Sequence, residues 1–182
     1  MSLQTWQETL ISAQVDGTAV NTTTTATSVL PGAAKFTLPA NFFSIGKVLR
    51  LTAQGRISTT TGPPTITFDI RFGSTVVWNG AAFTTVASLT NKSWELMVLL
   101  TCRAIGSGTA ANLLGVGKFT SSIVVGSTGG NANTAVLPDS APAVGTGFDS
   151  TSAQIVDLFA TWSASSASNS VQLHNFILEA LN

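Results

Sequence analysis

The stretch SWELMVLLTCRAIGSGTAANLLGVGKF, residues 93–119, decides the fold class. Two runs rich in strand-forming residues flank a Gly/Ser segment, which predicts two strands joined by a turn. One face of the first run is wholly apolar, whereas the opposite face is polar at its ends but apolar at Met97 and Leu99. A strand with one solvated face should alternate apolar and polar residues. We therefore expect either a segment of the same chain or another subunit to cover Met97 and Leu99.

The same period of two recurs along the chain. Residues 66–72 alternate four apolar side chains with three polar ones, and residues 46–59, 153–164 and 169–181 carry similar patterns. About eight short strands with turn-like connections predict an all-β fold. We expect a two-sheet antiparallel sandwich, jelly-roll-like, with an extended N-terminal arm. An immunoglobulin-like sandwich is the alternative.

The chain has 182 residues, which suits one domain. Residues 1–30 are predicted to form an N-terminal arm or edge strand, and residues 31–182 the β-sandwich domain. Residues 121–150 are rich in Gly, Ser, Asn and Pro and predict a long loop. The arm would contact a partner through its larger apolar side chains, which are Trp6, Leu10, Ile11 and Val15.

The charge content excludes several kinds of partner. Charged residues make up only 9% of the chain and the formal net charge is zero, whereas about 25% is usual. The eight basic residues form no cluster, which argues against nucleic acid and anionic membranes. The chain contains 27 Thr and 20 Ser. A neutral, hydroxyl-rich surface has little self-repulsion, so it favours association with copies of itself or other subunits.

No catalytic or ligand-binding template fits the chain. Cys102 and His174 are the single residues of their types; Cys102 is interpreted as a small buried apolar side chain and His174 as a structural or interface histidine. No metal-binding spacing or phosphate-binding loop occurs, so we expect no enzyme, no metal and no cofactor. Eight acidic residues make a carbohydrate-active enzyme the weakest alternative. Trp78, beside Asn79-Gly80 in a predicted turn, is expected to be exposed and could face a ligand.

The last predicted strand carries an apolar surplus like that of the strand in residues 93–105. Exposed apolar patches commonly mark contacts between proteins. The residues expected at such an interface are Met97, Leu99, Phe176 and Leu178.

Four segments carry a resemblance to a known group of proteins: GKVLRLTAQGRIST, PTITFDIRFGSTVV, the stretch at 93–119, and VDLFATWSASSASNSVQLHNFILE. Together they resemble virion proteins of tailed bacteriophages over about residues 34–120 and 152–180. These are strand-and-turn patterns, so no catalytic residues can be carried over.

The resemblance implies a jelly-roll-like module, often trimeric, on a phage head or tail. We expect a non-enzymatic capsid decoration (cement) or minor capsid protein that stabilises the particle through intersubunit contacts. Its partners would be copies of itself, as a homotrimer, and the major capsid protein or other virion proteins. It would be assembled in the host cytoplasm and reside in the virion. The alternative is a tail-fibre or receptor-binding module that recognises host surface glycan through residues 121–150 and Trp78.

Overall fold

The computed structural model describes residues 7–62, 64–125 and 133–181. Its regular elements are almost all strands, with one short 3-10 turn, η1 (Gly32–Ala34). The strands are β1 (Glu8–Ser12), β2 (Val20–Asn21), β3 (Thr27–Ser28), β4 (Phe36–Leu38), β5 (Val48–Ser58), β6 (Thr65–Phe72), β7 (Thr75–Thr84), β8 (Lys92–Ala104), β9 (Asn112–Ser121), β10 (Thr134–Leu137), β11 (Gln154–Trp162) and β12 (Ser170–Ala180). Within the described residues, no helix has the length and hydrophobicity needed to cross a membrane.

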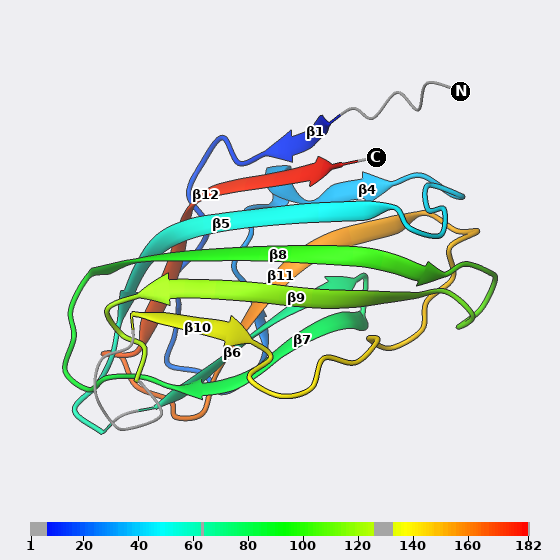
Figure 1. Ribbon diagram of the computed structural model, residues 1–182. Helices are drawn as coiled ribbons and strands as arrows, with labels where there is room; N and C mark the ends of the chain where they lie inside the picture. The colour runs from blue at the N-terminus through cyan, green and yellow to red at the C-terminus, as the bar shows by residue number, and fades with distance from the viewer. Residues whose placement is uncertain (1–6, 63, 126–132, 182) are drawn as a thin grey trace.

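The strands form two antiparallel sheets that pack face to face (Figure 1). The first sheet has the order β1-β12-β5-β8-β9-β10, and β2 also pairs with β12. The second sheet has the order β3-β11-β6-β7, and β4 also pairs with β11. The predicted two-sheet antiparallel sandwich is therefore confirmed.

The pairing follows a jelly roll. β1 pairs with β12, β3 and β4 pair with β11, β5 pairs with β8, and β6 pairs with β7. These pairs are nested in the sequence, as in one long hairpin that has been rolled up so that its layers make two sheets. β9 and β10 lie between β8 and β11 in sequence and extend the first sheet beyond this frame.

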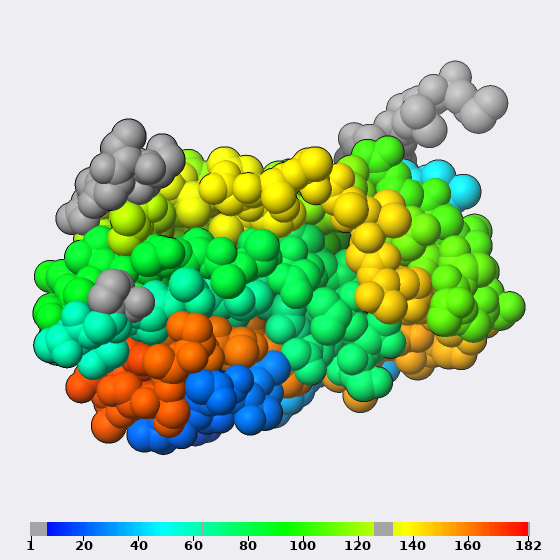
Figure 2. All heavy atoms as spheres, turned by 90° about the horizontal axis from the view of Figure 1, so that it is seen from below, coloured from blue at the N-terminus to red at the C-terminus, as the bar shows by residue number. Residues whose placement is uncertain are grey.

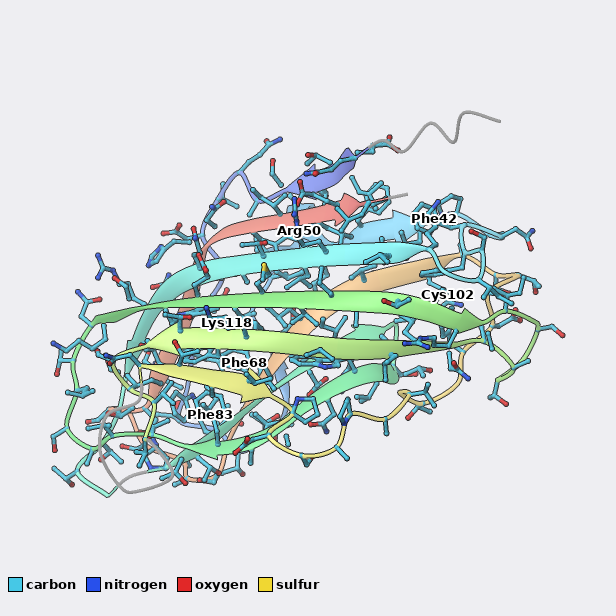
Figure 3. The ribbon with its side chains drawn as sticks, viewed as in Figure 1. Phe42, Arg50, Phe68, Phe83, Cys102 and Lys118 are labelled. Carbon is cyan, nitrogen blue, oxygen red and sulfur yellow. The ribbon has the colours of Figure 1, made fainter. Side chains whose placement is uncertain are left out.

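The core lies between the sheets and is built from the apolar faces that period-two alternation predicts. Ile66, Phe68, Ile70 and Phe72 of β6 are at most 2% exposed. Aromatic rings fill the centre, where the Phe68 ring centroid lies 5.4 Å from that of Phe119. Phe68 is labelled in Figure 3. Offset ring pairs at such distances add to the stabilisation from burial.

The N-terminal segment is part of both sheets from residue 8 onward. Of the two alternatives for residues 1–30, arm or edge strand, residues 8–12 adopt the edge strand, as β1 on β12. β2 then pairs with β12 in the first sheet, and β3 pairs with β11 in the second. Trp6 lies outside the described residues.

The predicted long loop contains some ordered pairing. Residues 134–137 form β10 on β9, and Val144 and Phe148 make isolated bridges to Leu114 and Ala111. Thr146 also donates its backbone N–H to Val76 of β7, at 3.2 Å. This loop therefore ties β9 of the first sheet to β7 of the second.

Candidate protein-interaction face

The outer face of the first sheet carries the side chains that point away from the core. Strand register places them in rows across the sheet. Met97 of β8 lies opposite Thr52 of β5 and Lys118 of β9. One row further along, Leu99 lies opposite Arg50 and Val116. Figure 3 shows Arg50 and Lys118 on the two strands that flank β8.

Three aliphatic side chains in the middle of this face are exposed, and we call them the apolar patch. Met97, Leu99 and Val116 are 38%, 39% and 43% exposed. Leu99 and Val116 are cross-strand partners, and Met97 follows on the same face of β8. An antiparallel sheet that faces water should be polar here. Among the residues that the structure describes, none covers Met97 and Leu99 completely, and exposed apolar patches are a feature of surfaces that contact other proteins.

A hydrogen-bonded ion pair borders the apolar patch. Arg50 Nε donates to Glu179 Oε2 at 2.7 Å, and the Gln7 amide also donates to the Glu179 carboxylate. The bond from Arg50 holds the pKa of Glu179 below its ordinary value, and the same bond raises the pKa of Arg50. The pair links β5 to β12 and keeps charge at the margin of the patch, which is the arrangement of an apolar centre with a polar rim.

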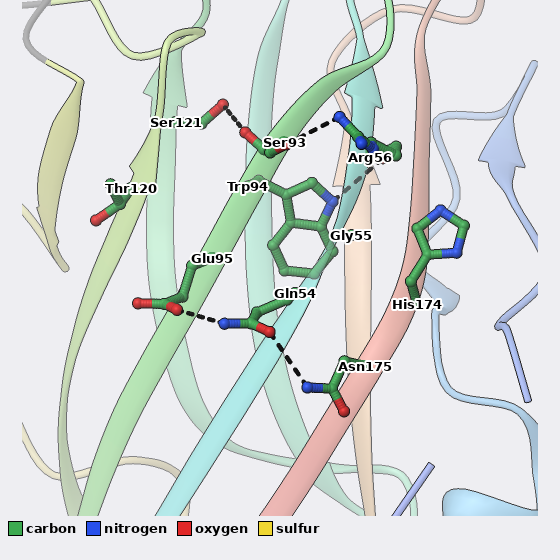
Figure 4. Close-up of a pocket in the computed structure, with 10 residues that line it drawn as sticks. All are labelled: Gln54, Gly55, Arg56, Ser93, Trp94, Glu95, Thr120, Ser121, His174 and Asn175. Carbon is green, nitrogen blue, oxygen red and sulfur yellow. Dashed lines mark hydrogen bonds between the residues drawn. The ribbon is translucent and has the colours of Figure 1, made fainter. Parts of the chain in front are cut away.

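A polar groove of about 630 Å³ adjoins the apolar patch on the same face (Figure 4). Its middle is a row of planar side chains from three strands. Asn175 Nδ2 donates to Gln54 Oε1 at 3.2 Å, and Gln54 Nε2 donates to Glu95 Oε2 at 2.5 Å. Glu95 lies two residues before Met97 on the same face of β8, so groove and patch form one continuous surface.

Two further side chains, Trp94 and His174, line the groove. Trp94 is 2% exposed, and its Nε1 donates to the Arg56 carbonyl at 3.2 Å, so this indole belongs to the wall between core and groove. His174 sits at a bulge in β12, and its Nδ1 lies 2.9 Å from Asp16 Oδ2. The single histidine thus connects the N-terminal segment to the last strand. This contact agrees with the structural interpretation of His174.

The structure brings together some of the predicted interface residues and separates others. Met97 and Leu99 lie side by side in the apolar patch. Leu10 and Ile11 of β1 are half-buried against the core of their own chain, and Val15 is 59% exposed in the segment after β1. Val116, which the sequence analysis missed, completes the patch. The alternating pattern could have identified it, because Val116 lies on the same face of residues 112–121 as the charged Lys118, which predicts that both face outward.

The expectation that Phe176 and Leu178 lie on an interface surface is wrong. Both side chains are 0% exposed and belong to the core. The cause is the bulge at His174, where the pairing with β5 shifts between Leu173 and Asn175. One extra residue reverses which side chains point inward, so Phe176 and Leu178 continue the core face begun by Leu173.

The expectation that Trp78 is exposed in a turn is also wrong. Trp78 is 2% exposed, and β7 continues through Asn79-Gly80 to Thr84. The Asn-Gly pair sits at a bulge, where the register with β6 shifts between Thr67 and Asp69. The indole packs where β9 has glycines: a Cβ at Gly115 would lie 2.1 Å from Trp78 Cδ1, and one at Gly117 would lie 2.9 Å from Cζ2. The two glycines of β9 therefore leave the space that the Trp78 ring occupies.

Comparison with known proteins identifies no family for this chain. No protein-family model and no curated protein matches the chain. A solved structure, the CBM2 module of the evolved Dit of Lactobacillus casei BL23 phage J-1, aligns over 99% of both chains with 11% sequence identity and a TM-score of 0.39. A match this distant supports no argument about what the chain does.

Proposed function

We propose that the protein is a non-enzymatic structural protein of a tailed-phage virion, a capsid decoration or minor capsid protein that stabilises the particle through contacts between subunits. The observation that carries the proposal is the apolar patch of Met97, Leu99 and Val116 in the middle of the outer sheet face. The resemblance of the strand-and-turn segments to phage virion proteins is the reason for proposing a virion as the assembly. The neutral, Ser/Thr-rich composition fits a subunit that lives packed against others.

The apolar patch can supply useful binding energy. Complete burial of one such side chain contributes about 1.5–3 kcal/mol. Since each is about 40% exposed, covering all three would contribute roughly 2–4 kcal/mol per subunit. That corresponds to roughly 30- to 1,000-fold in affinity. In a homotrimer the three copies would act together, so a weak single contact would give stable attachment to the major capsid protein.

The test compares patch variants with a matched control on particles that lack the protein. Leu99→Ser and the double variant Met97→Ser/Val116→Thr each remove part of the apolar patch without opening the core. Ile155→Ser is the control, because Ile155 is 47% exposed but lies on β11 of the other sheet. Sedimentation velocity gives the mass of each protein alone and the amount bound to particles.

We expect the unaltered protein and the Ile155 variant to bind particles and the patch variants to lose binding, with unchanged thermal unfolding. Patch variants that decorate particles as well as the unaltered protein would refute the patch as the contact. If the unaltered protein ignores heads but binds tails, the location on the head is wrong and the tail-associated alternative stands.

A further inference from the structure

A lysine stands inside the exposed apolar area of the outer sheet face. Lys118 of β9 lies directly opposite Met97 of β8 on one side and directly opposite Val136 of β10 on the other. Val136 is 56% exposed, so the apolar surface continues past Lys118 to the last strand of the sheet. That strand, β10, lies at the surface along one margin of the molecule, shown in yellow in Figure 2.

Strand geometry places the surrounding side chains close to Lys118. Directly opposite residues of an antiparallel pair have Cβ atoms about 4.5–5.5 Å apart, and Val116, two residues away on the same face of β9, is about 7 Å distant. Aliphatic side chains therefore flank the lysine on three sides. Its fourth neighbour on this face, Thr120, lines the polar groove. A protein that covers the apolar patch together with Val136 also covers the Lys118 side chain.

The ammonium group of Lys118 has no charged partner within the part of the chain that the structure describes. The carboxylate placed diagonally from it on β8, that of Glu95, instead accepts a hydrogen bond from Gln54 Nε2 at 2.5 Å. Arg50, on the opposite flank of the patch, is already paired with Glu179. Lys118 therefore offers a positive charge to whatever covers this face.

The cost of covering this charge selects the chemistry of the partner. Moving an ammonium group out of water is unfavourable unless the group is paired. A purely apolar partner would gain at the aliphatic side chains but lose at Lys118, whereas a partner with a carboxylate at this point gains at both. We propose that this face binds another virion protein whose contact surface places a carboxylate, surrounded by apolar side chains, against Lys118. The assignment rests on the proposed function and adds the charge and polarity of the surface to which the protein attaches.

A second copy of the same chain fits this description less well. Six of the eight acidic residues already accept a hydrogen bond or form an ion pair within their own chain, namely Asp16, Asp69, Glu95, Asp149, Asp157 and Glu179. Each of these would have to leave its present contact to reach Lys118 of a neighbour, so only Glu8 and Asp139 remain for a second copy to offer. This shortage of free carboxylates favours a different protein as the partner.

The test replaces Lys118 and measures binding to particles that lack the protein, by sedimentation over a series of protein concentrations. Lys118→Met removes the charge but keeps a side chain of similar length, and the sign of its effect separates the two kinds of partner. Against a carboxylate, the variant leaves that group unpaired and should weaken binding by roughly 10- to 100-fold. Against a purely apolar surface, it should strengthen binding. Lys118→Glu should weaken binding further, and Lys118→Arg should retain most of it. Lys92→Met is the matched control, because Lys92 is also exposed but lies at the start of β8.

We expect Lys118→Met to bind less tightly than the unaltered protein and Lys92→Met to bind equally well. Thermal unfolding should be unchanged in each variant, because the replaced side chains are exposed. Binding by Lys118→Met that equals or exceeds that of the unaltered protein would overturn the assignment and leave the proposed function intact. An equal loss in Lys92→Met would also overturn it, since long-range charge and not a local pair would then explain the loss.

Two further outcomes concern the identity of the partner. If the protein alone forms an oligomer that Lys118→Glu dissociates, a second copy occupies the site and the assignment to a different protein is wrong. An unaltered protein that binds neither heads nor tails would overturn the proposed function and this assignment together.

Discussion

Replacing Gly115 by alanine should destabilise the protein through the Trp78 ring. A Cβ at this position would lie 2.1 Å from Trp78 Cδ1 and 2.8 Å from Leu100 Cδ2. Carbon atoms in contact prefer about 3.5–4.0 Å, so the indole would have to move by more than about 1 Å. The ring has little room to slide along β9, because the backbone at Gly117 and Gly80 also packs near its far edge: a Cβ at either position would lie 2.9 Å from a ring atom.

The expected magnitude combines two opposing effects. Overpacking a core costs about 1–3 kcal/mol. Alanine in a strand interior recovers about 0.5–1 kcal/mol relative to glycine. We expect a net loss of roughly 1–2 kcal/mol. At about 2–4 °C per kcal/mol for a domain of this size, Tm should fall by roughly 2–8 °C. Thermal and urea unfolding measure the change, with an unchanged urea m-value showing that the denatured state is unaffected.

Two comparisons make the reasoning refutable. Gly32→Ala is the matched control, because a Cβ there meets nothing within 4 Å, and its Tm should stay the same or rise slightly. In a Trp78→Leu background, where the indole is gone, Gly115→Ala should cost much less than it does alone. A Gly115→Ala protein as stable as the unaltered one would refute the packing argument. An equal cost in both backgrounds would refute the assignment of that cost to Trp78.

Three further outcomes follow from single contacts. The hydrogen bond from Arg50 lowers the pKa of Glu179, so the ionised carboxylate stabilises the fold at pH values above its ordinary pKa of 4.5, and this stabilisation is lost as the pH falls through the lowered pKa. Glu179→Gln should therefore reduce the fall in the free energy of unfolding, measured in urea, between neutral and acid pH. An unchanged pH dependence would contradict this. Burial raises the pKa of the Cys102 thiol, so a disulfide reagent should label this thiol slowly in the folded protein and rapidly in urea. Fast labelling of the folded protein would show that β8 opens. Phe119→Ala should cost about 3–5 kcal/mol by chemical denaturation, because the ring is 0% exposed and stacks on Phe68; a loss below about 1 kcal/mol would mean that this cluster is not the centre of the core.

Period-two alternation predicts most of the fold because a strand with one buried face must show it. The pattern in residues 66–72 identifies β6 and its core face, and the pattern in residues 93–105 identifies β8. The same reasoning locates half of the candidate site, since Met97 and Leu99 interrupt the polar face of β8. It cannot identify Arg50 and Val116 as their neighbours, because cross-strand partners depend on register, which no local pattern fixes.

The two wrong expectations share one physical cause, a β-bulge. The extra residue at His174 reverses which side chains of β12 point inward. Leu173, Phe176 and Leu178 would fall on both faces of a regular strand, but the bulge places all three on the core face. In β7 the bulge at Asn79-Gly80 uses the same residue types that signal a turn, and it keeps Trp78 inside the strand. Bulges bend a strand and redirect side chains, which is why they recur beside binding surfaces. Here one bulge presents His174 to the polar groove, and the register of β7 against β6 shifts on both sides of Trp78. The breaks in alternation in these two strands therefore mark the places where side chains are redirected, which the alternating pattern by itself does not reveal.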